Sequence, residues 1–203
     1  MASEIKQGTL ELVNHLPILQ VITPMLIAPI LVVLNNKTLS WLLSFLGALA
    51  CLFISILLIQ AVSDGSILTY YLGGWVPPIG IEYRIDAANS ILLFLISIIS
   101  AIVLIFSYSS LHAEIPEEKH TLFYSCFLLC LTGLLGVVAT ADIFNVFVFL
   151  EISSLSTYVL VAQGAYLDRR ALSASFNYLI MGTIGATFFV IGIGYIYCLL
   201  YTS

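Results

Sequence analysis

Charged side chains are scarce in this sequence of 203 residues. Lysine, arginine, aspartate and glutamate make up 8% of the chain, against roughly 25% in ordinary soluble domains, and 61% of the residues are hydrophobic. So few polar side chains cannot cover a surface that faces water. The six lysines and arginines form no cluster, so nothing indicates a nucleic-acid partner. The composition excludes an ordinary soluble domain.

Side chains that bind metals are also few. The sequence has four cysteines and three histidines. Cys126 and Cys130 share a helix face, but without a nearby histidine or third cysteine their spacing favours packing over ligation. His15, His112 and His120 fall in the tail or in a connection, where we expect them to be solvated. No iron–sulfur, flavin or nicotinamide motif is recognisable, so we expect no metal and no cofactor in this chain.

Long apolar runs are what the sequence has in abundance. A helix needs about 20 apolar residues to cross the hydrocarbon of a membrane, and the runs are continuous, unlike the alternating strands of a porin-type barrel. The sequence predicts an all-α integral membrane protein, with a tail over 1–16 and a transmembrane bundle over 17–203. Pro24 and Pro29 predict a bend in the first span. The six predicted spans are 17–34, 39–62, 88–108, 121–140, 143–165 and 172–200.

The distribution of basic residues predicts how the spans are oriented. Six spans place four basic residues on one side of the membrane and two on the other, and the richer side is expected to be cytoplasmic. Both termini then lie outside, in a multi-pass protein of a cell membrane, with a bacterial inner membrane favoured. The cytoplasmic group is Lys37, Lys119, Arg169 and Arg170, and the outer group is Lys6 and Arg84.

One of the 17 charged side chains (six basic and eleven acidic) falls well inside a predicted span. Glu151 follows Asp142 by nine residues, which places it roughly 13 Å deeper if a helix begins at Asp142. A carboxyl group at that depth is costly and usually faces a bundle interior or a water-filled path. Burial disfavours its charged form and a nearby cation favours that form, so such a group can exchange a proton. The alternative is a protonated glutamate that donates a structural hydrogen bond.

Several residues near Glu151 have two open interpretations. Asp142 either caps a helix, as Asp86 is expected to do before the third span, or admits protons. Ser154 and Tyr178 are candidates for a proton path, and Tyr178 could equally make an interhelical hydrogen bond. Small residues in the sixth span predict close packing within the bundle or against another subunit. They are Gly182, Gly185, Ala186, Gly192 and Gly194.

Three segments resemble a known family. The segment Asp-Ile-Phe-Asn-Val-Phe-Val-Phe-Leu-Glu-Ile-Ser-Ser-Leu-Ser-Thr-Tyr at 142–158 resembles the fifth-helix motif of the antiporter-like membrane subunits. These subunits occur in Mrp-type cation/proton antiporters, respiratory complex I and membrane-bound hydrogenases. Gly-Gly-Trp-Val-Pro-Pro-Ile-Gly-Ile at 73–81 resembles the loop before the family's third helix, and 174–182 resembles its sixth. The resemblance implies that Glu151 is the family's proton-handling acid.

The sequence also departs from this family. Family members have two inverted halves, each with a broken helix and a buried lysine that partners the acid. No lysine falls inside a predicted span here, and the likeness covers only the family's N-terminal half. We therefore expect a truncated or split member, or a fragment, whose lysine partner comes from elsewhere.

The resemblance implies three functions. The first is the D-type subunit of a multisubunit Mrp-like antiporter that exchanges protons for a monovalent cation, Na⁺ being favoured. The second is a proton-translocating membrane-arm subunit of an NADH:quinone oxidoreductase or a membrane-bound hydrogenase, in which redox cofactors belong to partners. The third is a truncated, non-transporting remnant. In the first two, other membrane subunits and the lipid bilayer are the partners.

Overall fold

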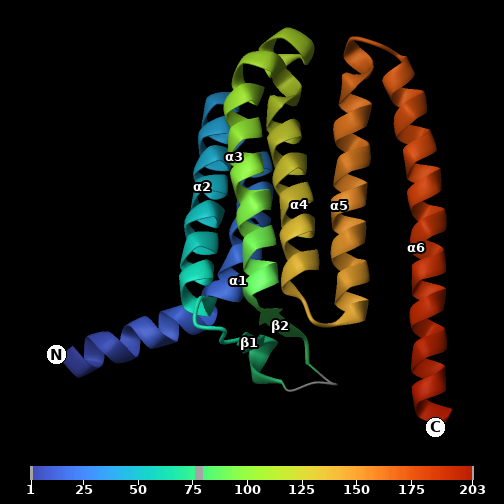
Figure 1. The fold of residues 1–203 in the computed structure, drawn as a ribbon. Helices are drawn as coiled ribbons and strands as arrows, with labels where there is room; N and C mark the ends of the chain where they lie inside the picture. The colour runs from blue at the N-terminus through green and yellow to red at the C-terminus, as the bar shows by residue number, and fades with distance from the viewer. Residues whose placement is uncertain (1, 76–79, 203) are drawn as a thin grey trace.

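The computed structural model describes the backbone of residues 2–75 and 80–202, and the side chains of 15–75, 80–111 and 113–200. Within these residues, six helices are long and apolar enough to cross a membrane, so the predicted all-α membrane fold is confirmed. Figure 1 shows them side by side. They are α1 (Ala2–Leu34), α2 (Lys37–Val62), α3 (Ala87–Glu114), α4 (His120–Ala139), α5 (Ile143–Gln163) and α6 (Arg170–Thr202).

The helix starts follow local capping chemistry. Asn36 caps α2 by accepting a hydrogen bond from the Leu39 amide at 3.4 Å. Asp86 caps α3, with Oδ1 accepting from the Asn89 amide at 2.9 Å. These side chains satisfy amide groups that have no partner within the helix. The capping role predicted for Asp86 is confirmed.

The first helix begins inside the predicted tail and contains Pro17, Pro24 and Pro29. Figure 1 shows its first part leaving the bundle at a steep angle and its second part lying within the bundle. Pro24 has no amide hydrogen to donate to the carbonyl of Gln20 four residues earlier. The Cys51 thiol of α2 donates to that carbonyl instead, at 3.7 Å, so the proline is compensated by a neighbouring helix.

A β-hairpin connects α2 to α3, where the sequence predicted only a long loop. Strand β1 (Leu68–Tyr71) pairs antiparallel with β2 (Glu82–Ile85), with Leu68 opposite Ile85. Short 3-10 turns occur at Leu72–Gly74, Glu117–Lys119 and Gly164–Tyr166. Part of the family-like segment at 73–81, residues 76–79, lies outside the described residues.

Burial falls off from α4 to α6. The core lies among α1 to α4 and includes Leu31, Leu58, Leu104 and Leu128, all fully buried. Helix α5 packs on α4, and α6 packs on α5 at the edge of the bundle (Figure 1). Most large apolar side chains of α6 are exposed. The two outermost helices, α5 and α6, are therefore the least buried of the described helices.

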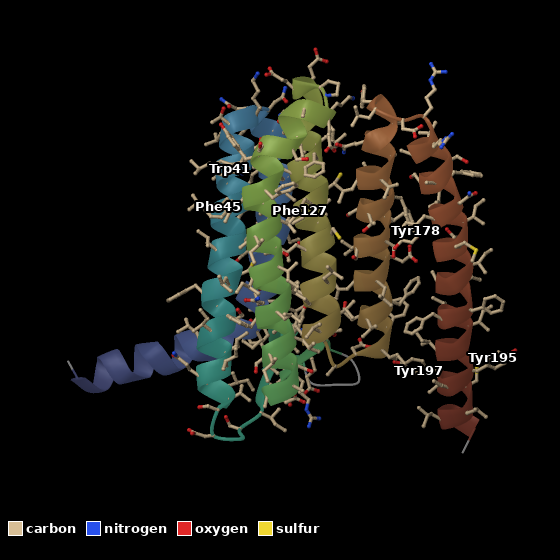
Figure 2. The ribbon with its side chains drawn as sticks, turned by 45° about the horizontal axis from the view of Figure 1, so that its top comes forward. Trp41, Phe45, Phe127, Tyr178, Tyr195 and Tyr197 are labelled. Atoms are coloured by element: carbon tan, nitrogen blue, oxygen red, sulfur yellow. The ribbon has the colours of Figure 1, made fainter. Side chains whose placement is uncertain are left out.

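The connections opposite the hairpin are joined by polar and aromatic contacts. Lys37, before α2, forms an ion pair with Glu117, between α3 and α4. Trp41 donates from Nε1 to the Leu104 carbonyl at 3.0 Å and stacks on Phe45, with ring centroids 5.7 Å apart. Figure 2 shows Trp41 and Phe45 together on α2.

The histidines occupy different surroundings. The prediction of a solvated His120 is wrong, because this residue is buried and its Nε2 lies 3.0 Å from the Ile115 carbonyl. It begins α4 directly after a short connection that folds over it. His15 is exposed and meets Tyr70 edge-on, with centroids 5.4 Å apart. The side chain of His112 lies outside the described residues.

Candidate functional site

Helix α5 carries Glu151 near its midpoint. Asp142 is the N-cap of this helix, and its Oδ1 accepts a hydrogen bond from the Phe144 amide at 2.9 Å. The capping interpretation of Asp142 is therefore confirmed, whereas proton entry through it stays a prediction. Nine residues separate the cap from Glu151, a rise of about 13 Å. A full turn or more of helix thus lies between the carboxyl group and either end of the span.

Glu151 lines a groove between α5 and α6. The groove holds about 370 Å³ and is lined from α5 by Phe147 and Glu151 and from α6 by Thr183, Ala186, Thr187, Val190 and Ile191. Glu151 is partly exposed within this chain, so the predicted burial of its carboxyl group is not confirmed here. The side chain makes no hydrogen bond or ion pair within the described residues. Helix α6 covers only one side of this part of α5.

The hydroxyl hydrogens of Thr183 and Thr187 are donated to backbone carbonyls of α6. Thr183 Oγ1 donates to the Leu179 carbonyl and Thr187 Oγ1 donates to the Thr183 carbonyl, both at 2.8 Å. What remains available on each hydroxyl is a pair of acceptor sites. A protonated Glu151 can donate to such an oxygen, but a charged Glu151 gains nothing from it. The two described threonine hydroxyls therefore present acceptor sites to the groove and no free donor.

A second contact between α5 and α6 lies two turns beyond Glu151. Tyr158 is buried, and its ring meets that of Tyr178 edge-on with centroids 5.1 Å apart. Figure 2 shows Tyr178 extending from α6 toward α5. Ser175 Oγ donates to the Tyr158 carbonyl at 2.7 Å. Tyr178 thus reaches α5 through Tyr158, and neither Tyr178 nor Ser154 lines the groove around Glu151.

Gly182 allows this contact. A Cβ added at Gly182 would overlap the Tyr158 hydroxyl, so α6 can approach α5 here only without a side chain. Of the small residues predicted to pack closely, Gly182 does so, whereas Gly185, Gly192 and Gly194 have nothing within 4 Å of an added Cβ.

We expect Gly182→Ala to weaken the contact between α5 and α6, because the new methyl group must displace Tyr158 or push α6 away. Overpacking of this kind costs about 1–3 kcal/mol. Thermal unfolding of the purified protein should show a lower midpoint. The double variant Gly182→Ala/Tyr158→Phe should recover part of the loss, since it removes the overlapping oxygen. A double variant no more stable than Gly182→Ala would contradict this account.

The opposite side of α5 packs closely on α4. A Cβ added at Gly133 would lie 2.6 Å from the Ser153 amide nitrogen, and one at Gly136 would overlap the Phe149 ring. Cys130 Sγ lies 3.6 Å from Ser153 Oγ and 3.4 Å from Thr157 Oγ1. Helix α5 is therefore fixed on α4 by small residues while Glu151 faces α6.

The sequence interpretation missed Thr183 and Thr187. Their spacing of four residues puts both hydroxyls on one face of a helix, which is a signal that the sequence does contain. Hydropathy alone could not show that this face turns toward Glu151. The structure brings Glu151 together with these threonines and leaves Asp142, Ser154 and Tyr178 at other positions along the two helices.

Comparison with known proteins identifies the family. The family model described as "NADH:quinone oxidoreductase/Mrp antiporter, TM" matches residues 140–202, the segment that contains every residue of the groove. The N subunit of the NADH-quinone oxidoreductase of Desulforudis audaxviator is 38% identical over 188 residues, which are 91% of this chain. The chain belongs to the antiporter-like membrane subunit family.

Other members of this family are similar over the same region. The D subunit of the Na(+)/H(+) antiporter of Bacillus subtilis is 30% identical over 185 residues, 91% of this chain. The chain spans 37% and 36% of the lengths of these two curated relatives. The predicted family is confirmed, while the relatives' activities pertain to much longer proteins.

Two solved structures share the fold of this antiporter-like chain. One, from a membrane-bound sulfane sulfur reductase described as an archaeal respiratory membrane complex, has a TM-score of 0.81 and 32% identity, covering 89% of this chain and 37% of its own. The other, from the Mrp complex of a Dietzia species, has a TM-score of 0.79 and 21% identity, covering 93% and 35%. Both come from multisubunit membrane complexes.

Proposed function

We propose that this chain forms part of a proton-translocating subunit of a multisubunit antiporter that exchanges protons for a monovalent cation. Glu151 carries the proton. The observation that supports this most is the groove, where a single carboxyl group faces acceptor oxygens and has no described partner. The relatives named as D subunits of Na(+)/H(+) antiporters support the choice of an antiporter, with Na⁺ as the cation.

The proposed cycle uses the difference between the two forms of Glu151. The neutral acid donates to a threonine oxygen of α6 and is retained in the apolar groove. When a cation approaches from another helix or from solution, it favours the carboxylate and the proton leaves. The resemblance to the family implies that this cation is a lysine from another part of the complex. Among the described residues of α5 and α6, no basic side chain lines the groove. Alternation between the two forms moves one proton at a time.

The proposed path to Glu151 follows α5. Asp142 lies at the outer end of α5, if the four basic residues opposite the hairpin face the cytoplasm, and both termini are then outside. From Glu151, Ser154 lies one turn further along α5, and the Tyr158–Tyr178 pair lies one turn beyond that. We propose that the proton path passes Asp142 first, then Glu151, and then Ser154 and Tyr178.

A second function is favoured by one observation. The relative with 38% identity is named as part of an NADH-quinone oxidoreductase rather than an antiporter. In such a complex the same glutamate would move protons in response to redox chemistry on partner subunits, and no external cation would be exchanged.

The test is proton movement in inverted membrane vesicles that contain the full complex. An antiporter should release protons from acidified vesicles when Na⁺, Li⁺ or K⁺ is added, with no electron donor. A redox-driven complex should acidify the vesicles only when an electron donor and a quinone are supplied. Activity of neither kind would contradict both functions and favour a non-transporting remnant.

A further inference from the structure

The β-hairpin is attached to the corner between α4 and α5. The Ala141 amide donates to the Glu82 carbonyl of β2 at 2.9 Å, and Tyr83 forms an isolated antiparallel bridge with Thr140. Figure 1 shows the hairpin beneath the bundle, next to the connection between α4 and α5. An outer segment that lies more than 50 residues away in the sequence therefore holds the residues that begin α5.

Two buried polar side chains extend this attachment into α5. Asn145 lies in the first turn of the helix, is 8% exposed, and donates from Nδ2 to Thr140 Oγ1 at 3.0 Å. The same threonine oxygen accepts from the Asp142 amide at 3.3 Å. Tyr83 is 4% exposed. Burial raises the pKa of Tyr83, and the side chain of Asn145 lowers it by a smaller amount, so the hydroxyl is neutral at physiological pH.

These contacts hold α5 at one position along the membrane normal. Hydrocarbon offers no directional interaction that holds an apolar helix at a given depth. The contact of Phe149 with Gly136 fixes α5 relative to α4, but it does not fix the depth of either helix in the membrane. The Ala141–Glu82 hydrogen bond and the Tyr83–Thr140 bridge attach the residues before α5 to the hairpin, which lies outside the membrane. Asn145 attaches the first turn of α5 to the same Thr140. Glu151 follows Asn145 by six residues, so a shift of the first turn is transmitted to it through continuous helix.

We propose that Tyr83 and Asn145 are positioning residues that set the depth of Glu151 by tying α5 to the β-hairpin. The tie itself follows from the contacts above, and only its effect on transport rests on the proposed function. It gives the outer hairpin a direct route to the acid: a displacement of β2 moves the first turn of α5.

The experiment measures depth directly. A nitroxide is attached at Leu150→Cys, an exposed position beside Glu151, in the full-length protein within its complex, with the four native cysteines replaced by alanine. Relative accessibility to oxygen and to a water-soluble nickel chelate reports the depth. We expect Asn145→Ala and Tyr83→Phe to shift the label by about 3 Å, the rise of two residues.

The matched control is Asn89→Ala. Asn89 Nδ2 donates to the Arg84 carbonyl at 3.0 Å, so it ties the same strand to α3 instead of α5. The label depth should be unchanged in this variant. An equal depth in Asn145→Ala and in Asn89→Ala overturns the inference, whatever happens to transport. If Asn145→Ala fails to insert, Tyr83→Phe, which removes one oxygen, carries the comparison.

Transport is measured on the same substitutions without the label. We expect at least about a tenfold loss for the two tie variants at normal insertion, because small displacements at a reacting group have large effects on rate. A depth shift with unchanged transport overturns the positioning role if Glu151→Gln is inactive in the same assay. If Glu151→Gln is itself fully active, the proposed function fails, while a depth shift still supports the tie.

Discussion

Substitution of Glu151 by glutamine is expected to abolish proton translocation. Glutamine has nearly the same shape, and its amide can donate to the same threonine oxygens, but it cannot release a proton. Proton transfer by a positioned side chain contributes a factor of about 10²–10⁴ to rates, so the Glu151→Gln rate should fall at least about a hundredfold. The measurement is fluorescence quenching of a pH-sensitive dye in inverted vesicles.

Two controls make this result specific to the groove. Glu118→Gln removes an exposed carboxyl group in the connection between α3 and α4 and should leave the rate within about twofold, in the range expected for a charge that takes no part. Glu151→Asp retains the carboxyl group at a shorter reach and should keep part of the activity. A Glu151→Gln complex that inserts normally and translocates protons at the wild-type rate would falsify the assignment of Glu151.

Gly133→Ala is expected to destabilise the packing of α4 against α5. Its Cβ would lie 2.6 Å from both the Ser153 amide nitrogen and Cβ, and 2.7 Å from the Phe149 carbonyl oxygen. These are backbone atoms or are fixed to the backbone, so no side-chain rotation relieves the overlap and α4 must separate from α5. We expect a loss of about 1–3 kcal/mol in the free energy of unfolding.

Unfolding in mixed micelles of increasing denaturing-detergent fraction measures this loss. The control is Gly185→Ala in α6, where an added Cβ meets nothing within 4 Å. That variant should be as stable as the wild type or slightly more stable, because alanine favours a helix over glycine by about 1 kcal/mol. Equal stability of Gly133→Ala and Gly185→Ala would contradict the close approach of α4 to α5.

The membrane spans could be predicted because their signal is local. A run of about 20 apolar residues is sufficient evidence for a crossing helix, and all six expected spans overlap the observed ones. Capping is local in the same sense, which is why Asp86 and Asp142 were identified from position alone. Glu151 could be identified because it is a single charged residue within a long apolar run.

Features that depend on distant pairing could not be predicted. Strands β1 and β2 have four residues each, too short for a pattern, and they exist because they pair with one another across an intervening segment. The burial of His120 depends on how the connection from α3 folds over it. Likewise, the sequence shows Thr183 and Thr187 on one face of a helix, but only the packing of α6 on α5 turns that face toward Glu151.

The decline in burial from α4 to α6 parallels the order in which a ribosome makes these helices. Chains generally assemble from the N-terminus as they are synthesised, and α1 to α4 bury most of their shared apolar surface among themselves. These four helices can therefore associate before α5 is complete. Helix α5 then adds through the glycines of α4, and α6 follows it, with α5 as its main neighbour among the described residues. The groove that is lined by Glu151 thus forms only after α1 to α4 have associated beneath it.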